Sequence, residues 1–149
     1  MRRIDREITD RQEMFDVLMR CNTMSIGFQG DEYPYVVPVS FGGVKDGERI
    51  TLYYHCAMEG KKVELAERFP KVCVQAHIFH RVEKLTTRYE SVIAYGTVEK
   101  VQGKEAVAGL KAITEHYGYA NYPVDSCESF PKTGVYKITV ESITGKRNL

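Results

Sequence analysis

The chain has 149 residues, enough for one domain with its own core, and we expect a single domain over residues 1–149. Its net charge of +1 argues against a nucleic-acid-binding surface, because such surfaces carry a basic excess. No apolar run approaches the roughly 20 residues that span a bilayer, and the charged start MRRIDREITD is unlike a signal peptide. We therefore expect a cytoplasmic protein without membrane or nucleic-acid partners.

The first half of the sequence combines one helix with several strands. Asp10, followed three residues later by a glutamate, forms a capping-box pattern at the start of an amphipathic helix over 10–21. The predicted strands span 23–29, 34–43 and 50–55. A hairpin signal, Asp46-Gly47, precedes the last of them. Pro34 and Pro38 cannot donate to a ladder, so their strand is expected at an edge, with a bulge, or with an exposed face.

The second half follows the same scheme and ends in a long strand. The predicted helices span 60–69 and 104–118, and the predicted strands span 71–79, 86–101 and 135–145. Pro70 and Gly118 end the two helices, and Gly96 is a possible bulge position in the longest strand. Most connections are too short for parallel crossovers. We therefore predict a mainly β fold, an antiparallel β-barrel with flanking helices.

The cysteines and histidines form no recognisable metal motif. The four cysteines lie far apart without a CxxC pair, and in the cytoplasm reduced thiols are expected. His77 and His80 lie three residues apart near Cys73, which suggests a zinc site at first sight. On a strand, however, residues three apart point to opposite faces, so we predict no metal site.

Residues 57–62 end in Gly60-Lys61-Lys62, directly before the predicted helix over 60–69. A helix N-terminus exposes unpaired N–H groups and partial positive charge, and such ends bind phosphate. Two lysines there are favourable only if an anion lies nearby. The alternative interpretation is that both lysines are solvated and that one pairs with Glu64 or Glu67.

His55 and Cys56 end the strand before this loop. The histidine is a candidate ligand-binding or acid–base group, or else a half-buried strand end. Cys56 is interpreted as a small packed residue, since only the nearby lysines would lower the pKa of its thiol.

The order of three segments, PYVVPVSF, YYHCAMEGKK and YESVIAYG, resembles the flavin-binding split-barrel family of the pyridoxamine 5′-phosphate oxidase type. Within it, the chain is most similar to the 5-nitroimidazole resistance (Nim-type) branch. The resemblance covers nearly the whole chain. It implies a split barrel of the FMN-binding type and a homodimer with FMN, or FAD, held at the interface.

The resemblance also assigns site residues. In such proteins the strand that matches Val36–Phe41 lines the flavin ring, the segment that matches His55–Lys62 surrounds the phosphate, and the segment that matches Glu90–Val92 comes from the other subunit. The implied cofactor contacts are Val37, Pro38, Val39, Ser40, Phe41, His55, Cys56, Ala57, Gly60, Lys61, Lys62, Glu90, Ser91, Val92 and Lys146. His55, within a His-x-Ala pattern, is the implied catalytic or substrate-positioning residue.

The implied activity is flavin-dependent oxidation or reduction of a small molecule, with a reduced pyridine nucleotide as donor, although the chain has no GxGxxG fingerprint. Pyridoxamine phosphate is not the expected substrate, because the chain lacks tryptophan and ends in GKRNL. The alternatives are a flavin sensor without turnover, a barrel that binds haem through His55 or a deazaflavin, and an interaction protein with an empty pocket.

Three tyrosines, Tyr117, Tyr119 and Tyr122, cluster where the predicted helix over 104–118 gives way to a loop over 119–132. This loop is either a lid over the cofactor pocket or a surface loop without that role.

Overall fold

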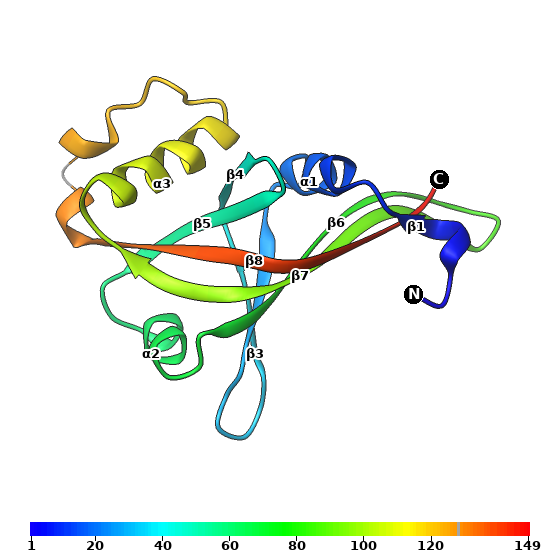
Figure 1. Cartoon of the computed structure of the whole chain (residues 1–149), viewed down its shortest axis with the longest axis horizontal. Coiled ribbons are helices and arrows are strands. Elements are labelled where there is room, and N and C mark those ends of the chain that lie inside the picture. The colour runs from blue at the N-terminus through cyan, green and yellow to red at the C-terminus, as the bar shows by residue number, and fades with distance from the viewer. Residues whose placement is uncertain (128) are drawn as a thin grey trace.

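The computed structural model describes residues 1–127 and 129–149 and consists mainly of one strongly curved antiparallel sheet (Figure 1). Its strands follow the order β3-β2-β6-β7-β8-β5-β4, and the short β1 pairs with β8. The strands are β1 (Glu7–Ile8), β2 (Met24–Phe28), β3 (Tyr35–Val39), β4 (Gly42–Asp46), β5 (Arg49–Ala57), β6 (Lys71–Glu83), β7 (Thr86–Val101) and β8 (Thr133–Asn148). The order ends at β3 and β4, so the barrel is split between them. The mainly β, antiparallel prediction is confirmed.

Helices cover the outside of this sheet. The α-helices are α1 (Arg11–Met19), α2 (Lys61–Arg68) and α3 (Gly103–His116), and the 3₁₀ turns are η1 (Ile4–Arg6), η2 (Val124–Ser126) and η3 (Phe130–Lys132). Helix α3 packs against β4 and β5, and α1 packs against β6, β7 and β8. The β6–β7 hairpin projects beyond the barrel together with the end of β8 (Figure 1). In the described part of the chain, no helix is long and apolar enough to cross a membrane.

The first helix forms where its cap and apolar pattern predict it. The Asp10 carboxylate accepts a hydrogen bond from the Glu13 backbone N–H at 2.8 Å, which satisfies one of the unpaired donors of the first turn. Met14, Val17 and Leu18 are the buried side chains of α1. This helix therefore contributes its apolar face to the main core.

The single strand predicted over 34–43 is wrong. The chain forms β3, turns at Ser40 and Phe41, and starts β4 at the opposite edge of the sheet. The break has a packing cause, because Phe41 is fully buried and a Cβ on Gly42 would lie 2.3 Å from the Ala112 carbonyl carbon in α3. The expectation that Pro38 lies on an edge strand is confirmed.

The other strands agree with the pattern but are mostly longer. Strands β5, β6 and β8 exceed their predicted ranges, whereas β7 has the predicted range, 86–101. The register between β7 and β8 shifts between Tyr95 and Gly96, as expected for a bulge there. A Cβ on Gly96 would lie 2.3 Å from the Thr139 carbonyl oxygen, so this close strand approach requires glycine.

The core fills the barrel interior with alternate side chains of the strands. Phe28, Phe41 and Tyr54 are among its largest fully buried members. The Tyr54 ring stacks on Tyr136 at a centroid distance of 5.2 Å, near the end of the barrel next to α2. Each such side chain contributes roughly 1.5–3 kcal/mol by burial, so the barrel is a stable support for residues at its open ends.

Candidate functional site

A hollow of about 410 Å³ lies where β3 and β5 end and α2 begins. It is lined by Pro38, Val39, Ser40, His55, Cys56, Ala57, Lys62, Lys132 and Thr133. All but the last two belong to the residues that the family resemblance assigns to cofactor binding. We refer to this site as the lysine hollow.

Strand pairing explains how distant segments meet there. Strands β5 and β8 pair so that Cys56 lies opposite Gly134 and Ala57 lies opposite Thr133. This register brings Lys132, at the end of η3, beside the loop that leads into α2. Sequence reasoning missed Lys132 and Thr133, because only the long-range pairing of β5 with β8 places them at the site.

The start of α2 is uncapped and depends on Gly60. This residue has φ 141° and ψ 179°, a conformation that only glycine adopts readily, although a Cβ there would meet open space. No side chain caps the helix, so its first N–H groups lack a side-chain acceptor. The loop is therefore held in a strained shape that leaves a positive helix end open to a ligand.

The two lysines of α2 have different surroundings. Lys62 is half-buried and lines the lysine hollow, whereas Lys61 is exposed and does not. Lys61 lies near Asp31, whose carboxyl pKa is lowered mainly by hydrogen bonds from Arg68 and also by the charge of Lys61. The anticipated partner Glu64 pairs instead with Arg68 at 3.1 Å.

The charge of the lysine hollow is unbalanced. Lys62 and Lys132 both line it, and none of the lining residues that the structure describes is acidic. Within residues 1–127 and 129–149, neither lysine forms an ion pair. Two uncompensated cations beside an uncapped helix end fit an anionic group such as a phosphate.

His55 and Cys56 are both uncharged at neutral pH. His55 is exposed, yet the protein around its ring removes enough water to lower the pKa of the imidazole. Burial raises the pKa of the Cys56 thiol, although Lys62 and Lys100 act in the opposite direction. The thiol is therefore not activated as a nucleophile. His55 offers one neutral ring nitrogen as donor and the other as acceptor.

Some predicted residues lie behind the site rather than on it. Val37 packs against the core and Phe41 is fully buried, with its ring centroid 4.6 Å from that of His116. Pro38 and Ser40, on the outward side of β3 and its turn, are exposed. Gly60 shapes the loop without lining the hollow. In this edge strand, Val37 therefore serves the core, Pro38 faces the site, and Val39 contacts both.

The remaining predicted residues lie at the other end of β7 and β8. Ser91 is opposite Lys146, and Val92 is buried. Thr133, which lines the lysine hollow, is at the opposite end of β8, roughly 40 Å along the strand from Lys146. Within one chain, the structure does not bring these residues to the lysine hollow.

Glu90 forms an ion cluster at that distant end. Its buried carboxylate accepts hydrogen bonds from Arg20 at 2.9 and 3.0 Å and from Arg147 at 3.1 Å, and it lies 3.0 Å from His80 Nε2. The hydrogen bonds from Arg20, with further help from His80 and Arg147, lower the pKa of Glu90 to about 2. His77 has a different partner, the Gln75 amide nitrogen at 3.0 Å.

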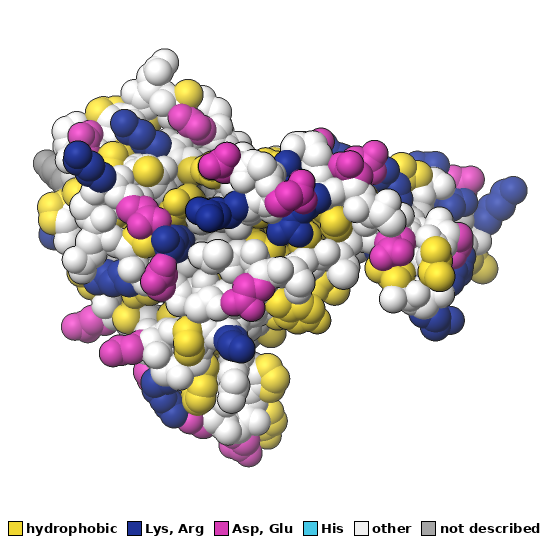
Figure 2. All heavy atoms as spheres, in the orientation of Figure 1, with side chains coloured by type: hydrophobic (Ala, Val, Ile, Leu, Met, Phe, Trp, Pro, Cys, Tyr) yellow, Lys and Arg dark blue, Asp and Glu magenta, His cyan; other side chains and the backbone are white. Residues whose placement is uncertain are grey.

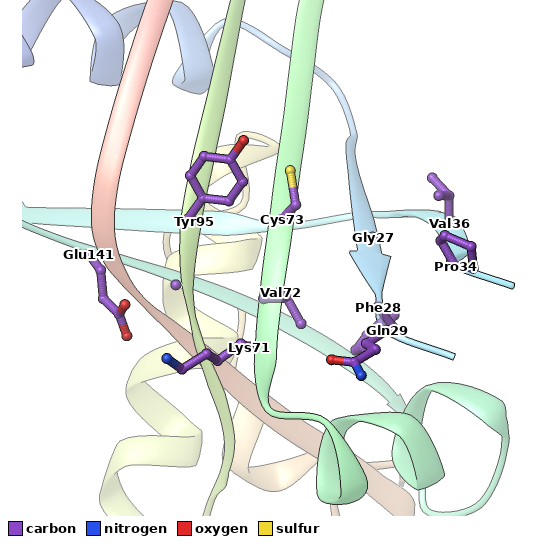
Figure 3. Close-up of a pocket in the computed structure, with 11 residues that line it drawn as sticks. Gly27, Phe28, Gln29, Pro34, Val36, Lys71, Val72, Cys73, Tyr95 and Glu141 are labelled. Carbon is purple, nitrogen blue, oxygen red and sulfur yellow. The ribbon is translucent and has the colours of Figure 1, made fainter. Parts of the chain in front are cut away.

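The outer face of the sheet carries a shallow apolar hollow of about 510 Å³ (Figure 3). Strand register places Val36, Gly27, Cys73 and Tyr95 side by side across β3, β2, β6 and β7. Val36 is 66% exposed and Tyr95 is 55% exposed. In the view of Figure 2, hydrophobic side chains gather along the underside of the long strands and the β2–β3 hairpin, whereas charges of both signs alternate elsewhere.

These features define a split barrel with a positively charged hollow at one end, and comparison with known proteins identifies its family. The sequence model of the family described as "Pyridoxamine 5'-phosphate oxidase" matches residues 10–147. The chain therefore belongs to this family, and the prediction made from the three segments is confirmed. No protein among those with curated descriptions is significantly similar in sequence.

Solved structures support the same assignment. A candidate 5-nitroimidazole antibiotic resistance protein from Bacteroides thetaiotaomicron has 29% identity and a TM-score of 0.83, over 94% of this chain and 85% of that one. A FAD-binding protein from Mesorhizobium loti has 20% identity and a TM-score of 0.71, over 97% and 98%. A FAD and haem binding protein from Mycobacterium smegmatis has 17% identity and a TM-score of 0.78, over 96% and 73%. The last two show the fold alone.

Proposed function

We propose that this protein binds a flavin, FMN or the FMN half of FAD, with a phosphate in the lysine hollow. The observation that carries this proposal is the pair of uncompensated lysines, Lys62 and Lys132, beside the uncapped start of α2. Membership of the family, and the flavin-binding proteins among its structural neighbours, support the choice of ligand.

The surrounding residues fit the rest of such a ligand. Exposed Pro38 and Ser40 form the wall of the hollow at the edge strand β3, where no further strand covers them. The flavin, when bound, supplies hydride and electron transfer. The chain's own part is to hold the phosphate through Lys62 and Lys132 and to orient a reacting molecule through the neutral imidazole of His55.

We further propose a homodimer in which the outer sheet face forms the interface. The exposed apolar side chains of Val36, Ile93 and Tyr95 lie on one face of neighbouring strands, and burial of this face is favourable. Ser91 lies further along β7, opposite Lys146 on β8. In a two-fold assembly, this part of the partner subunit completes the flavin site at the lysine hollow.

The proposed activity is a flavin-dependent oxidoreduction with a reduced pyridine nucleotide as electron donor and a small molecule as acceptor. The 29% identical protein associated with 5-nitroimidazole resistance makes reduction of a nitro group the first acceptor reaction to test. The observation that favours an enzyme over a static flavin store is His55, an uncharged imidazole on the wall of the hollow with no described hydrogen-bond partner.

The decisive experiment is the absorption spectrum of the purified protein, followed by titration of the flavin-free protein with FMN and with FAD. We expect oxidised-flavin bands, release of the flavin on denaturation, and a homodimer in sedimentation analysis. Anaerobic addition of NADH or NADPH should bleach the bands, and a nitroaromatic acceptor should restore them. A protein that binds neither flavin would refute the proposal, and a Soret band would replace flavin with haem.

A further inference from the structure

Strand pairing does not hold the turn between β3 and β4. The pairing of β3 with β2 ends at Val39, and the pairing of β4 with β5 begins at Gly42. Ser40 and Phe41 lie between these two ladders, where the barrel is split. Ser40 is exposed and lines the lysine hollow, so the contacts that fix this turn also fix one wall of the hollow.

The Tyr117 hydroxyl fixes this turn from the end of α3. The Phe41 backbone N–H donates to Tyr117 Oη at 3.2 Å, and the same hydroxyl donates to the Asn22 carbonyl oxygen at 2.5 Å. A hydroxyl accepts and donates at the same time. One side chain therefore ties the β3–β4 turn to the loop between α1 and β2.

The preceding residue of α3 holds the side chain of Phe41. The His116 ring centroid lies 4.6 Å from that of Phe41, and His116 Nε2 lies 2.9 Å from the Cys21 carbonyl oxygen. The Tyr117 ring packs edge-on against His116, with their centroids 4.8 Å apart. The end of α3 therefore holds Phe41 through both its ring and its backbone. Loss of the Tyr117 acceptor would leave a partly buried N–H without this partner, which is unfavourable.

We infer that Tyr117 is a positioning residue for the flavin. It acts through the Phe41 N–H on Ser40, whose hydroxyl is held toward the ring system of the bound flavin at the β3 wall. This inference rests on the proposed function, because the flavin is the ligand that the wall orients. Lys62 and Lys132 approach the hollow from α2 and η3 and hold the phosphate. Tyr117 therefore controls how the ring is oriented and not how the phosphate is bound.

A matched pair of tyrosine variants tests the role of this hydroxyl. Tyr117→Phe removes the hydroxyl and keeps the ring, whereas Tyr119→Phe makes the same change at a side chain that is 65% exposed. In a fluorescence titration we expect Tyr117→Phe to weaken FMN binding about tenfold, and Tyr119→Phe to stay within about twofold of wild type. Equal FMN affinities of wild type and Tyr117→Phe would overturn the inference.

The absorption spectrum of bound FMN separates positioning from a general loss of stability. A residue that only stabilises the barrel would lower the midpoint temperature of unfolding in Tyr117→Phe and leave the spectrum at saturating FMN unchanged. A residue that orients the ring alters the polar contacts of the isoalloxazine when it is replaced. We therefore expect the long-wavelength band of bound FMN to shift in Tyr117→Phe, and an unchanged band would refute the positioning role.

A double-mutant cycle tests the path through Ser40. Ser40→Ala removes the hydroxyl on the wall itself, and we expect it to weaken FMN binding. If Tyr117 acts through Ser40, adding Tyr117→Phe to Ser40→Ala should weaken binding by no more than about twofold further, because the effects of coupled residues are not additive. Affinity losses that multiply in full would show that the two residues act independently, which contradicts the inference.

The wild-type protein supplies a test that does not depend on whether the variants fold. FMN should shift the Ser40 amide signal in NMR, and the Phe41 amide hydrogen should exchange at least about tenfold more slowly than in an unfolded peptide. FMN binding without a shift at Ser40 would refute the inference and leave the flavin proposal intact. If the wild type binds no flavin, the proposed function itself fails, and the positioning role fails with it.

Discussion

Basic side chains lie near both ends of β8, but they have an acidic partner at only one of them. At one end, Arg20, Arg147 and His80 surround the buried carboxylate of Glu90. At the other, Lys62 and Lys132 face a hollow whose described lining residues include no acidic one. Charge that is compensated within the chain stabilises the fold, whereas charge left uncompensated beside an open hollow is available for a ligand. Figure 1 shows these ends far apart, with α2 near one and α1 near the other.

The largest expected effect is on stability, at the compensated end. Glu90→Ala leaves Arg20 and Arg147 without their shared acceptor, and we expect the free energy of unfolding to fall by about 3 kcal/mol. Denaturant titration measures it. Asp5→Ala, which removes an exposed ion pair with Arg3, is the control and should leave the free energy of unfolding almost unchanged. If both variants lost the same unfolding free energy, the buried ion cluster would be no more stabilising than an exposed ion pair, which would contradict this prediction.

The same cluster predicts a pH dependence with a defined sign. The Glu90 pKa is lowered from 4.5 to about 2 in the folded protein, so its stabilisation is complete above the unfolded pKa and is lost as pH falls from about 4.5 towards 2. Glu90→Gln has no such titration. The difference in unfolding free energy between wild type and Glu90→Gln should therefore shrink over this range. A difference that stays constant from pH 6 to pH 3 would show that the carboxylate is not held ionised by its partners.

At the uncompensated end the effect should fall on ligand affinity instead. We expect Lys62→Ala combined with Lys132→Ala to weaken FMN binding by about 2–3 kcal/mol, roughly 30- to 150-fold, because two charge-assisted contacts are lost. The flavin-free stability should not decrease, because neither lysine has an ion-pair partner among the described residues. Lys61 lies near Asp31 and does not line the hollow. The FMN affinity of Lys61→Ala should therefore remain within twofold of wild type in a fluorescence titration.

A smaller effect is expected from a change at Gly60, the backbone position that starts α2 beside the lysine hollow. Gly60→Ala places a side chain at φ 141°, which costs about 1–2 kcal/mol of stability or shifts the loop, although no atom blocks the new methyl. Gly103→Ala is the matched control, since it also meets open space but lies at φ 60°, a milder strain. In thermal unfolding, Gly60→Ala should have a lower midpoint temperature than Gly103→Ala. The FMN affinity should fall only in Gly60→Ala. A lower midpoint temperature for Gly103→Ala would contradict the claim that the conformation of Gly60 shapes the site.

Local patterns in the sequence predicted most of the elements. The period of β7, the Asp10 cap and the Gly96 bulge depend on neighbours along the chain, and all three were found as expected. The break at Phe41 was missed because it depends on contact between Gly42 and α3, about 70 residues later in the chain.

The candidate site divides in the same way. His55, Cys56 and Lys62 lie in one continuous segment with a helix-start signal, so the sequence identified them. Lys132 and Thr133 reach the site through the register of β5 with β8, which local periodicity does not encode. The family resemblance assigned Glu90 to the cofactor, and its ion partners Arg20, His80 and Arg147 became evident only in the folded chain.

The smallest effect is expected on the titration of His55, on the wall of the lysine hollow. Desolvation lowers the His55 pKa in the flavin-free protein, so its NMR titration should fall below that of a histidine in an unfolded peptide. A phosphate held by Lys62 and Lys132 adds negative charge near the ring, and FMN should therefore raise the His55 pKa. His116, whose Nε2 lies 2.9 Å from the Cys21 carbonyl oxygen and which does not line the lysine hollow, is the internal control. A His55 titration that FMN leaves unchanged would mean that the phosphate lies elsewhere, even if the flavin binds.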